Sequence, residues 1–194
     1  MKDHLRPALV LLVVLSVLTG LLYPLAVTVI AQILFPSEAL GSLVMREGKA
    51  TGSRLIGQSF TEPRYFWGRL SATGPVPYNA ASSSGSNLGP LNKTLRDNAV
   101  ARIEALRAAD PGNVAAVPVD LVTSSGSGLD PHISIAAALY QAPRVARVRA
   151  MDLGAVKALI TKSTTGRGLR LFGEPVVNVL ELNLALDAGG GPQR

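Results

Sequence analysis

Cysteine is absent from the 194-residue chain, and histidine occurs only twice, at His4 and His132. The absence of cysteine excludes a disulfide framework, although an exported domain does not require one. A zinc site would lack ligands of the usual type and spacing. We therefore expect no metal-binding residues in this chain.

The short motifs of common catalytic and nucleotide-binding sites are missing as well. Neither Ser86 nor Ser127 lies in the G-x-S-x-G sequence of a nucleophile elbow. No Gly-Lys-Ser/Thr sequence occurs to cradle a triphosphate, and the Asp-Lys-Thr-Gly-Thr phosphorylation sequence of P-type pumps is absent. We expect no catalytic residues, and the sequence assigns no nucleotide-binding residues.

Charged residues are scarce, at 16% of the chain, and Lys plus Arg outnumber Asp plus Glu by 19 to 13, for a net charge of +6. They form no dense basic run of the kind that nucleic-acid-binding proteins carry, so nucleic acid is not an expected partner. The surplus favours anionic lipid headgroups or acidic protein surfaces. It has the wrong sign for concentrating cations.

A long apolar run dominates the N-terminal part of the sequence, since 7–37 contains no charged residue. Its core, 8–34, would form a helix of about 40 Å, longer than the roughly 30 Å of hydrocarbon in a bilayer. A cleaved signal peptide is the alternative, because Lys2 and Arg6 precede the run and Val29-Ile30-Ala31 offers small residues near a cut. The run exceeds the usual length of a secretory apolar region, which favours a retained transmembrane helix.

The charges that flank this run predict its orientation. Lys2 and Arg6 adjoin its N-terminal end, whereas Arg46 is the nearest basic residue on the other side. Basic residues close to a span tend to stay in the cytoplasm. We therefore expect a cytoplasmic flank at 1–7, a transmembrane helix at 8–34, an extracytoplasmic globular domain at 35–188 and a disordered tail at 189–194.

Small residues recur within the apolar run near helical spacing. Ser16 and Gly20 form a small-x-x-x-small pattern, which lets another helix approach closely, and Tyr23 follows three positions later. Chance in a span rich in Leu and Val explains so short a pattern equally well. A partner helix at this position is therefore a hypothesis.

The rest of the sequence predicts an α+β fold, with the single N-terminal transmembrane helix followed by one globular mixed α/β domain. Turn residues, apolar periodicity and capping residues suggest the following elements. They are a hairpin at 41–56 with Gly48 in its turn, a long loop at 73–90, an amphipathic helix at 91–109, a helix at 131–141 capped by Asp130, a helix at 153–161 capped by Asp152, a strand at 168–172 and a final segment with helix signals at 175–188.

Two groups of side chains invite a functional interpretation. Asp130 and His132 suggest a base with its orienting partner and hence an extracytoplasmic hydrolase, but a helix cap beside a packed imidazole is the commoner arrangement. Arg144, Arg147 and Arg149 could hold an anion or a partner carboxylate, although a solvated helix surface is the default for such arginines. Trp67 and Tyr65, in turn, suit either the edge of a core or an interface.

Six separated blocks of the chain resemble the KdpC family, the C subunit of the bacterial Kdp potassium-transporting P-type ATPase. Departures are small: Leu70 stands where the family usually has Pro, and Leu91 where it usually has Thr. The blocks are GSRLIGQSF (52–60), YFWGRLSA (65–72), YNAASSSGSNLGPLN (78–92), SGSGLDPHIS (125–134), QAPRVARVR (141–149) and GEPVVNVLELNLAL (173–186).

The resemblance implies a non-catalytic accessory subunit of a high-affinity, ATP-driven potassium uptake complex in the bacterial inner membrane. It implies three partners: a potassium-translocating subunit, an ATP-hydrolysing subunit and a small single-span subunit. The family is described as a catalytic chaperone that raises the ATP affinity of the ATP-hydrolysing subunit, so ATP is implied by the resemblance only. Potassium is the transported ion of the complex, and no covalently bound cofactor is expected.

We also expect that the domain lies over the external mouth of the potassium-translocating subunit and stabilises the assembly. Glycines in the predicted loops allow tight turns, while neighbouring Ser and Asn residues supply neutral hydrogen bonds. The candidate interface residues are Ser16, Gly20, Tyr23, Tyr78, Asn79, Gly85, Ser86, Asn87, Ser125, Gly126, Ser127, Gly128, Asp130, His132 and Arg144.

Overall fold

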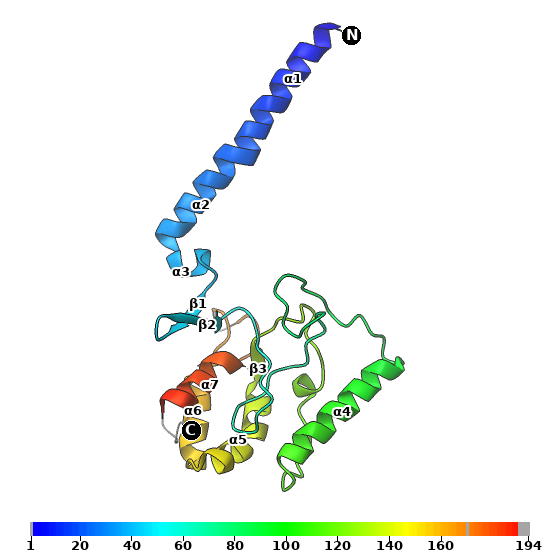
Figure 1. Cartoon of the computed structure of the whole chain (residues 1–194), viewed down its shortest axis with the longest axis vertical. Coiled ribbons are helices and arrows are strands. Elements are labelled where there is room, and N and C mark those ends of the chain that lie inside the picture. The colour runs from blue at the N-terminus through cyan, green and yellow to red at the C-terminus, as the bar shows by residue number, and fades with distance from the viewer. Residues whose placement is uncertain (1, 170, 190–194) are drawn as a thin grey trace. The chain divides into compact units, whose positions relative to one another are not determined.

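The computed structural model describes residues 2–169 and 171–189, and residue contacts divide the chain into two units between Thr51 and Gly52 (Figure 1). Each unit is described by itself. Most of the tail that we expected to be disordered, 190–194, lies outside the described residues. Its first residue, Gly189, is the C-cap of the last helix.

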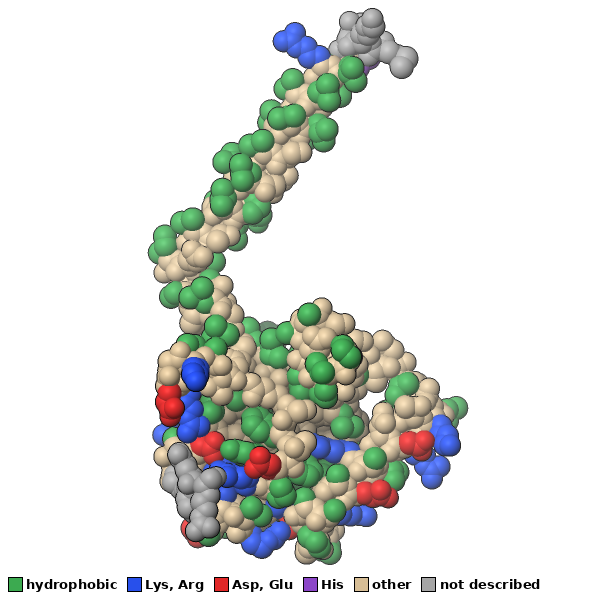
Figure 2. Space-filling view, viewed as in Figure 1, with side chains coloured by type: hydrophobic (Ala, Val, Ile, Leu, Met, Phe, Trp, Pro, Cys, Tyr) green, Lys and Arg blue, Asp and Glu red, His purple; other side chains and the backbone are tan. Residues whose placement is uncertain are grey.

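The first unit contains the predicted apolar helix. It consists of α1 (Lys2–Val17), a π-helical turn η1 (Leu18–Leu22) and α2 (Tyr23–Leu34). The stretch His4–Leu34 is long and apolar enough to cross a membrane. Figure 2 shows apolar side chains along this helix. The prediction of a single apolar helix over 8–34 is confirmed.

The π-helical turn has a cause in the sequence. Pro24 has no N–H to donate to the carbonyl of Gly20, and its ring crowds that carbonyl. The turn widens in front of Pro24, and the N–H of Tyr23 bonds to the carbonyl of Leu18. Because a π turn adds a residue, Tyr23 is rotated by up to about 100° from the position that a straight α-helix would give it relative to Ser16.

A short helix, α3 (Pro36–Ala39), and a β-hairpin follow. The hairpin pairs β1 (Leu43–Arg46) with β2 (Lys49–Ser53). The two turn residues, Glu47 and Gly48, have φ angles of 51° and 76°. Two positive φ angles are what a type I′ turn requires, so the predicted hairpin with Gly48 in its turn is confirmed.

The second unit combines a small antiparallel sheet with four α-helices, which confirms the predicted α+β class. The strands are ordered β3-β5-β4, and Ile133 pairs with Val177 at its centre. The elements are α4 (Lys93–Ala109), the 3₁₀ helix η2 (Val119–Leu121), β3 (His132–Ser134), α5 (Ile135–Arg149), α6 (Leu153–Lys162), β4 (Thr164–Thr165), β5 (Val176–Asn178) and α7 (Val179–Ala188).

The helix predicted at 131–141 is present from Ile135 on, but its predicted start at 131 and its predicted cap, Asp130, are wrong. Residues 132–134 form β3, and the helix begins only at Ile135, because Ser134 is the N-cap whose hydroxyl accepts a hydrogen bond from Ala137 N–H at 3.0 Å. Pairing with β5 keeps the chain extended up to that point. The helix then continues through Pro143 to Arg149, beyond the predicted end.

Other predicted elements had mixed outcomes. The helices at 91–109 and 153–161 are confirmed as α4 and α6, and Asp152 caps α6 by accepting a hydrogen bond from Ala155 N–H. The predicted strand at 168–172 is wrong, because the described residues there form a tight reversal with paired backbone bonds between Gly168 and Phe172. The final segment starts as β5, and its helix begins only at Val179.

The core lies between the sheet and the helices α5, α6 and α7. Only Leu106 of α4 is fully buried. On the predicted apolar face, Leu95, Ala99 and Ile103 are half-buried, and Leu91 is 99% exposed. The largest apolar side chains of the core are Phe66, Leu106, Leu121, Ile133, Val145, Val156, Ile160, Val177, Leu182 and Leu186.

An irregular segment, 62–69, runs through this core without joining the sheet. Buried carbonyls need hydrogen-bond donors, and here side chains supply them. The carbonyls of seven of these eight residues each accept a hydrogen bond from a side chain. The carbonyls of residues 62, 63, 64, 66, 67, 68 and 69 accept, in this order, from Trp67 Nε1, Arg144 Nη1, Arg149 Nε, Asn183 Nδ2, Gln141 Nε2, Arg102 Nη2 and the Tyr78 hydroxyl.

Two side-chain amides take the place of a neighbouring strand at the centre of this segment. Asn183 of α7 accepts from Phe66 N–H at 2.8 Å and donates to the Phe66 carbonyl at 3.0 Å. Gln141 of α5 does the same for Trp67, at 2.8 and 3.1 Å. Both aromatic side chains are buried. The sequence left open whether Trp67 lies at the edge of a core or in an interface, and the structure places it in the core.

Two of the three arginines at 144–149 are inside the molecule, so a solvated surface is the wrong interpretation for them. Arg144 and Arg149 are 1% and 7% exposed, whereas the Arg147 side chain is 56% exposed and pairs with Asp110 at 2.7 Å. Burial lowers the pKa of Arg144 to about 10, which leaves it charged at neutral pH. Its guanidinium lies 4.8 Å from the centre of the Trp67 ring.

Replacing Arg144 should therefore be costly. Arg144→Leu leaves the Pro63 carbonyl without its side-chain donor and removes a donor from the Gln141 amide. We expect the free energy of unfolding to fall by about 2–4 kcal/mol. Urea unfolding of the full chain in detergent micelles, followed by Trp67 fluorescence, measures this change. The exposed control, Arg96→Leu, should stay within about 0.5 kcal/mol of the wild type, and equal stability of the two variants would contradict the assignment.

Candidate functional site

Two loops that are far apart in the sequence are joined by hydrogen bonds, and most of the predicted interface residues lie on them. We call 70–92 and 122–130 the paired loops. Ser127 O accepts hydrogen bonds from Ser84 N–H at 2.9 Å and from the Ser83 hydroxyl at 3.0 Å. Ser71 Oγ donates to Gly128 O at 2.6 Å. The fold thus brings together two stretches that carry most of the predicted interface residues.

Glycine is required where the paired loops touch. A Cβ atom at Gly85 would lie 2.9 Å from the carbonyl oxygen of Gly126. Gly128 has a φ angle of 68°, and a Cβ atom there would lie 2.5 Å from the carbonyl oxygen of Ser84. Real Cβ atoms do not approach a carbonyl oxygen so closely. These glycines therefore let the two backbones meet.

Tyr78 fastens the first of the paired loops to the core. Its hydroxyl donates to the Arg69 carbonyl at 2.6 Å, and its N–H donates to Ser71 Oγ at 2.8 Å. A Cβ atom at Gly57 would lie 2.3 Å from the ring, so the ring packs closely against that backbone. Burial raises the pKa of Tyr78, and the charge of Asp130 also raises it, against opposing effects of Arg102 and Arg69.

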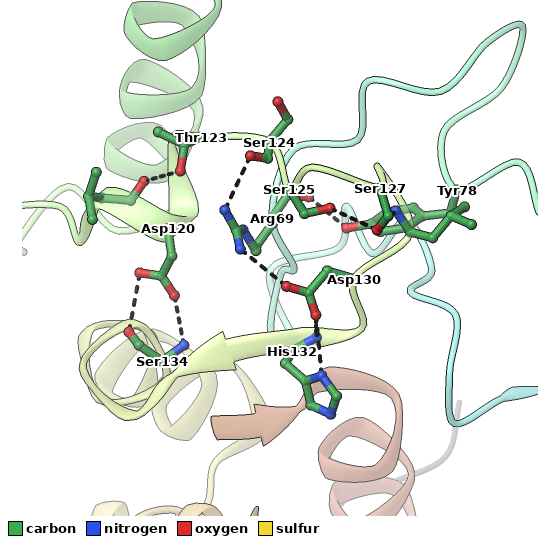
Figure 3. Close-up of polar contacts among 12 residues, drawn as sticks. Arg69, Tyr78, Asp120, Thr123, Ser124, Ser125, Ser127, Asp130, His132 and Ser134 are labelled. Atoms are coloured by element: carbon green, nitrogen blue, oxygen red, sulfur yellow. Dashed lines mark hydrogen bonds and ion pairs between the residues drawn. The ribbon is translucent and has the colours of Figure 1, made fainter. Parts of the chain in front are cut away.

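Asp130 joins the second of the paired loops to Arg69, at the end of segment 62–69 (Figure 3). Its Oδ2 lies 3.1 Å from Arg69 Nη1, and its Oδ1 accepts from His132 N–H at 3.0 Å and lies 3.2 Å from His132 Nδ1. Arg69 also donates to the carbonyl of Ser124. The carboxylate thus holds a turn and an arginine, and it does not cap a helix.

The pKa of Asp130 is lowered in the folded chain. Burial alone would raise it, but hydrogen bonds from the His132 ring and backbone, together with the positive charges of His132 and Arg69, outweigh that effect. The carboxylate therefore stays ionised at neutral pH. It contributes stability above its ordinary pKa, and this contribution disappears as the pH falls through the lowered value.

The hydrolase alternative depends on a nucleophile near the contact between Asp130 and His132. Figure 3 shows the His132 ring pointing away from Ser125 and Ser127. Among the residues that the structure describes, no serine hydroxyl forms a hydrogen bond with this ring. The Oγ atoms of Ser125 and Ser127 instead lie 3.4 Å from each other. Nothing in this geometry favours hydrolysis.

The other predicted residues have different surroundings. Asn79 lies in the first of the paired loops, where its N–H donates to Thr73 Oγ1 at 2.9 Å. Ser86 lines a groove beside α4, and Asn87 is exposed with a φ angle of 51°. Arg144 is enclosed in the core and offers no group at the surface, so its prediction as an interface residue is wrong.

Sequence reasoning missed two residues that organise this region. Arg69 links Asp130 to Ser124, and Ser71 bonds to both Tyr78 and Gly128. Both lie in the short block 65–72, but no motif marks them, because their partners are 7 to 61 residues away. Within the described ranges, no group of three or more His, Cys, Asp or Glu side chains is placed to hold a metal ion.

The paired loops should respond to pH through Asp130. At pH 7 we expect Asp130→Asn to lower the free energy of unfolding by about 1 kcal/mol, since the carboxylate is partly exposed. The difference from the wild type should shrink below about pH 4, where the unfolded carboxylate binds a proton. Urea unfolding in micelles at several pH values checks this. The exposed control Asp97→Asn should show no such trend, and a difference for Asp130→Asn that is unchanged at pH 3 would refute it.

Comparison with known proteins agrees with the resemblance found in the sequence. Residues 5–188 match the family model described as KdpC: K+-transporting ATPase, c chain. The potassium-transporting ATPase KdpC subunit of Polaromonas naphthalenivorans (strain CJ2) is 66% identical over 188 residues, which cover 97% of this chain and 96% of that protein. The corresponding subunit of Janthinobacterium sp. (strain Marseille) is 60% identical over 187 residues, or 96% and 99% of the two chains.

A third relative, the KdpC subunit of Methylococcus capsulatus (strain ATCC 33009 / NCIMB 11132 / Bath), is 59% identical over 188 residues, or 97% of this chain and 99% of that protein. The matches include both the apolar helix and the second unit. From this agreement over nearly its whole length, the chain belongs to the KdpC family, the c chain of K+-transporting ATPases.

Proposed function

We propose that this chain is a non-catalytic accessory subunit of the Kdp complex, which uses ATP to take up potassium with high affinity. The observation that carries this proposal is the family match over 5–188. It agrees with a second unit whose polar contacts are mostly used to hold its own loops together. On this view the chain assists chemistry and transport that other subunits perform.

We place the chain in the bacterial inner membrane, with the apolar helix crossing once and the second unit outside. Lys2 and Arg6 next to the span support a cytoplasmic N-terminus. The helix offers its whole surface to lipid or to a partner helix, since none of its described side chains is buried. The small residues Ser16 and Gly20 are where a partner helix could approach most closely.

The paired loops are the surface that we assign to the potassium-translocating subunit. Their backbones are fixed by internal hydrogen bonds, so they lose little conformational entropy when a partner binds. They offer hydroxyl, amide and carbonyl groups, with Asn87 exposed in the C-terminal part of the first loop. Neutral groups of this kind can lie over a cation pathway without adding positive charge to it.

An effect on ATP affinity would then be indirect. The sequence has no phosphate-binding loop, and an external domain cannot reach cytoplasmic ATP. We propose that the domain binds one conformation of the pump better than another, which couples it to the nucleotide site of the ATP-hydrolysing subunit. The full chain without its partners should accordingly show no heat of ATP binding in calorimetry.

Topology is the first test. Protease added to intact spheroplasts should digest the second unit, while a cytoplasmic marker protein stays whole. This result is expected because the basic N-terminal flank directs the following domain outward. Protection of the second unit, in cells whose external marker protein is digested, would reverse the proposed placement and would make direct contact with ATP feasible.

Helix association can be tested because the chain has no native cysteine. We expect Ser16→Cys to crosslink to a membrane-spanning partner when the complex is expressed together. Val14→Cys should not, since two residues along an α-helix lie on nearly opposite faces. Both sites lie in α1 and are exposed. Crosslinking to lipid alone from both positions would argue against a partner helix at this face.

A further inference from the structure

A groove runs beside α4, and the family match gives it no role. Its volume is about 420 Å³, in the range of sites for small organic ligands. One wall is the inner side of α4, and the others are parts of the paired loops. The apolar side chains that line it include Leu70, Leu88, Leu95, Ala105 and Val122.

The groove lies where α4 is packed less deeply on the rest of the unit. Leu106, in the C-terminal half of the helix, is 1% exposed, whereas Leu95, in its first turn, is only half-buried. A helix with this apolar stripe normally buries it against a neighbour.

A single cation stands at the wall of this groove. Arg102 donates to the carbonyls of Gly68 at 2.7 Å and Leu121 at 3.2 Å, and its guanidinium lies 5.0 Å from the centre of the Trp67 ring. All of these partners are neutral. Among the described residues, Arg102 forms no ion pair, and its Nη1 forms no hydrogen bond. Burial also lowers the pKa of Arg102, which reflects the cost of holding this charge away from water.

We propose that the groove binds an amphiphile with one anionic head, a carboxylate or a phosphate, and an apolar chain. The head would pair with Arg102, and the chain would lie against the leucines and alanines of the groove. Charge complementarity favours this occupant, because a partly buried cation without an acidic partner is stabilised by an anion. A protein partner would bury about 800 Å² on each side, much more than this slot offers.

Two sources share this chemistry, a free fatty acid and an anionic phospholipid. The test uses the full chain in lipid nanodiscs and exploits Trp67, the one tryptophan of the sequence, as a probe beside Arg102. Brominated chains quench tryptophan fluorescence at short range. The first probe is 9,10-dibromostearate, the second its neutral methyl ester, and the third a dibrominated phosphatidylglycerol built into the disc.

We expect saturable quenching by the acid, by the brominated phospholipid or by both, and the pattern identifies the source. The methyl ester should need a concentration about tenfold higher or more, because it lacks the charge that pairs with Arg102. Equal quenching by the acid and its ester, or the absence of saturable quenching with both anionic probes, would overturn the proposal.

Matched variants on α4 locate the site. Ala105→Phe fills the groove and should raise the half-saturating concentration about tenfold, whereas Ala108→Phe, exposed but outside the lining, should stay within about twofold of the wild type. Arg102→Gln should weaken the anionic probes and leave the ester unchanged. If Arg102→Gln fails to fold, the comparison of Ala105→Phe with Ala108→Phe decides alone. Identical quenching of Ala105→Phe and the wild type would refute the site.

Discussion

The second unit is built around the need to satisfy a buried backbone that belongs to no sheet. Segment 62–69 enters the core, where every unpaired carbonyl would cost free energy. Gln141 and Asn183 hydrogen-bond both polar backbone groups of Trp67 and Phe66. Apart from Trp67 Nε1, which belongs to the segment itself, the other donors come from α4, α5 and one of the paired loops, so this one segment fixes the positions of elements that touch it from several sides.

The same arrangement changes what the net charge means. The composition gives +6, yet Arg144 and Arg149 are almost fully buried and serve carbonyl groups or Asp187. Two guanidinium groups lie 4.8–5.2 Å from the ring centre of each of two aromatic residues, Trp67 and Tyr65. Two of the 19 Lys and Arg side chains are therefore enclosed in the core, so the surface is less positive than the composition suggests.

Local signals in the sequence predicted what depends on local physics. The apolar run, the hairpin at Gly48 and the cap at Asp152 all follow from a few adjacent residues, and all are present. The helix expected directly after Asp130 starts only at Ile135, because strand pairing with β5, more than 40 residues away, overrides a good capping sequence. Strands of two or three residues are too short to show alternation, so β3, β4 and β5 left no readable pattern.

The candidate site was partly predictable for the same reason. Its loops were visible in composition, whereas their pairing depends on contacts such as that of Gly85 with Gly126, which no single segment reveals. Arg144 was misplaced because an arginine in a helix usually faces water. Arg144 instead donates to the carbonyl of Pro63, which is distant in the sequence and comes near Arg144 only in the folded chain.

The two strand-to-helix junctions have a consequence for how this unit opens. Ser134 and Asn178 each end a strand and cap the helix that follows, and the strands they end are paired with each other. Separating β3 from β5 would therefore strip the first turns of α5 and α7 of their ordered caps at the same moment. The sheet and these two helices are thus joined into one block that opens cooperatively.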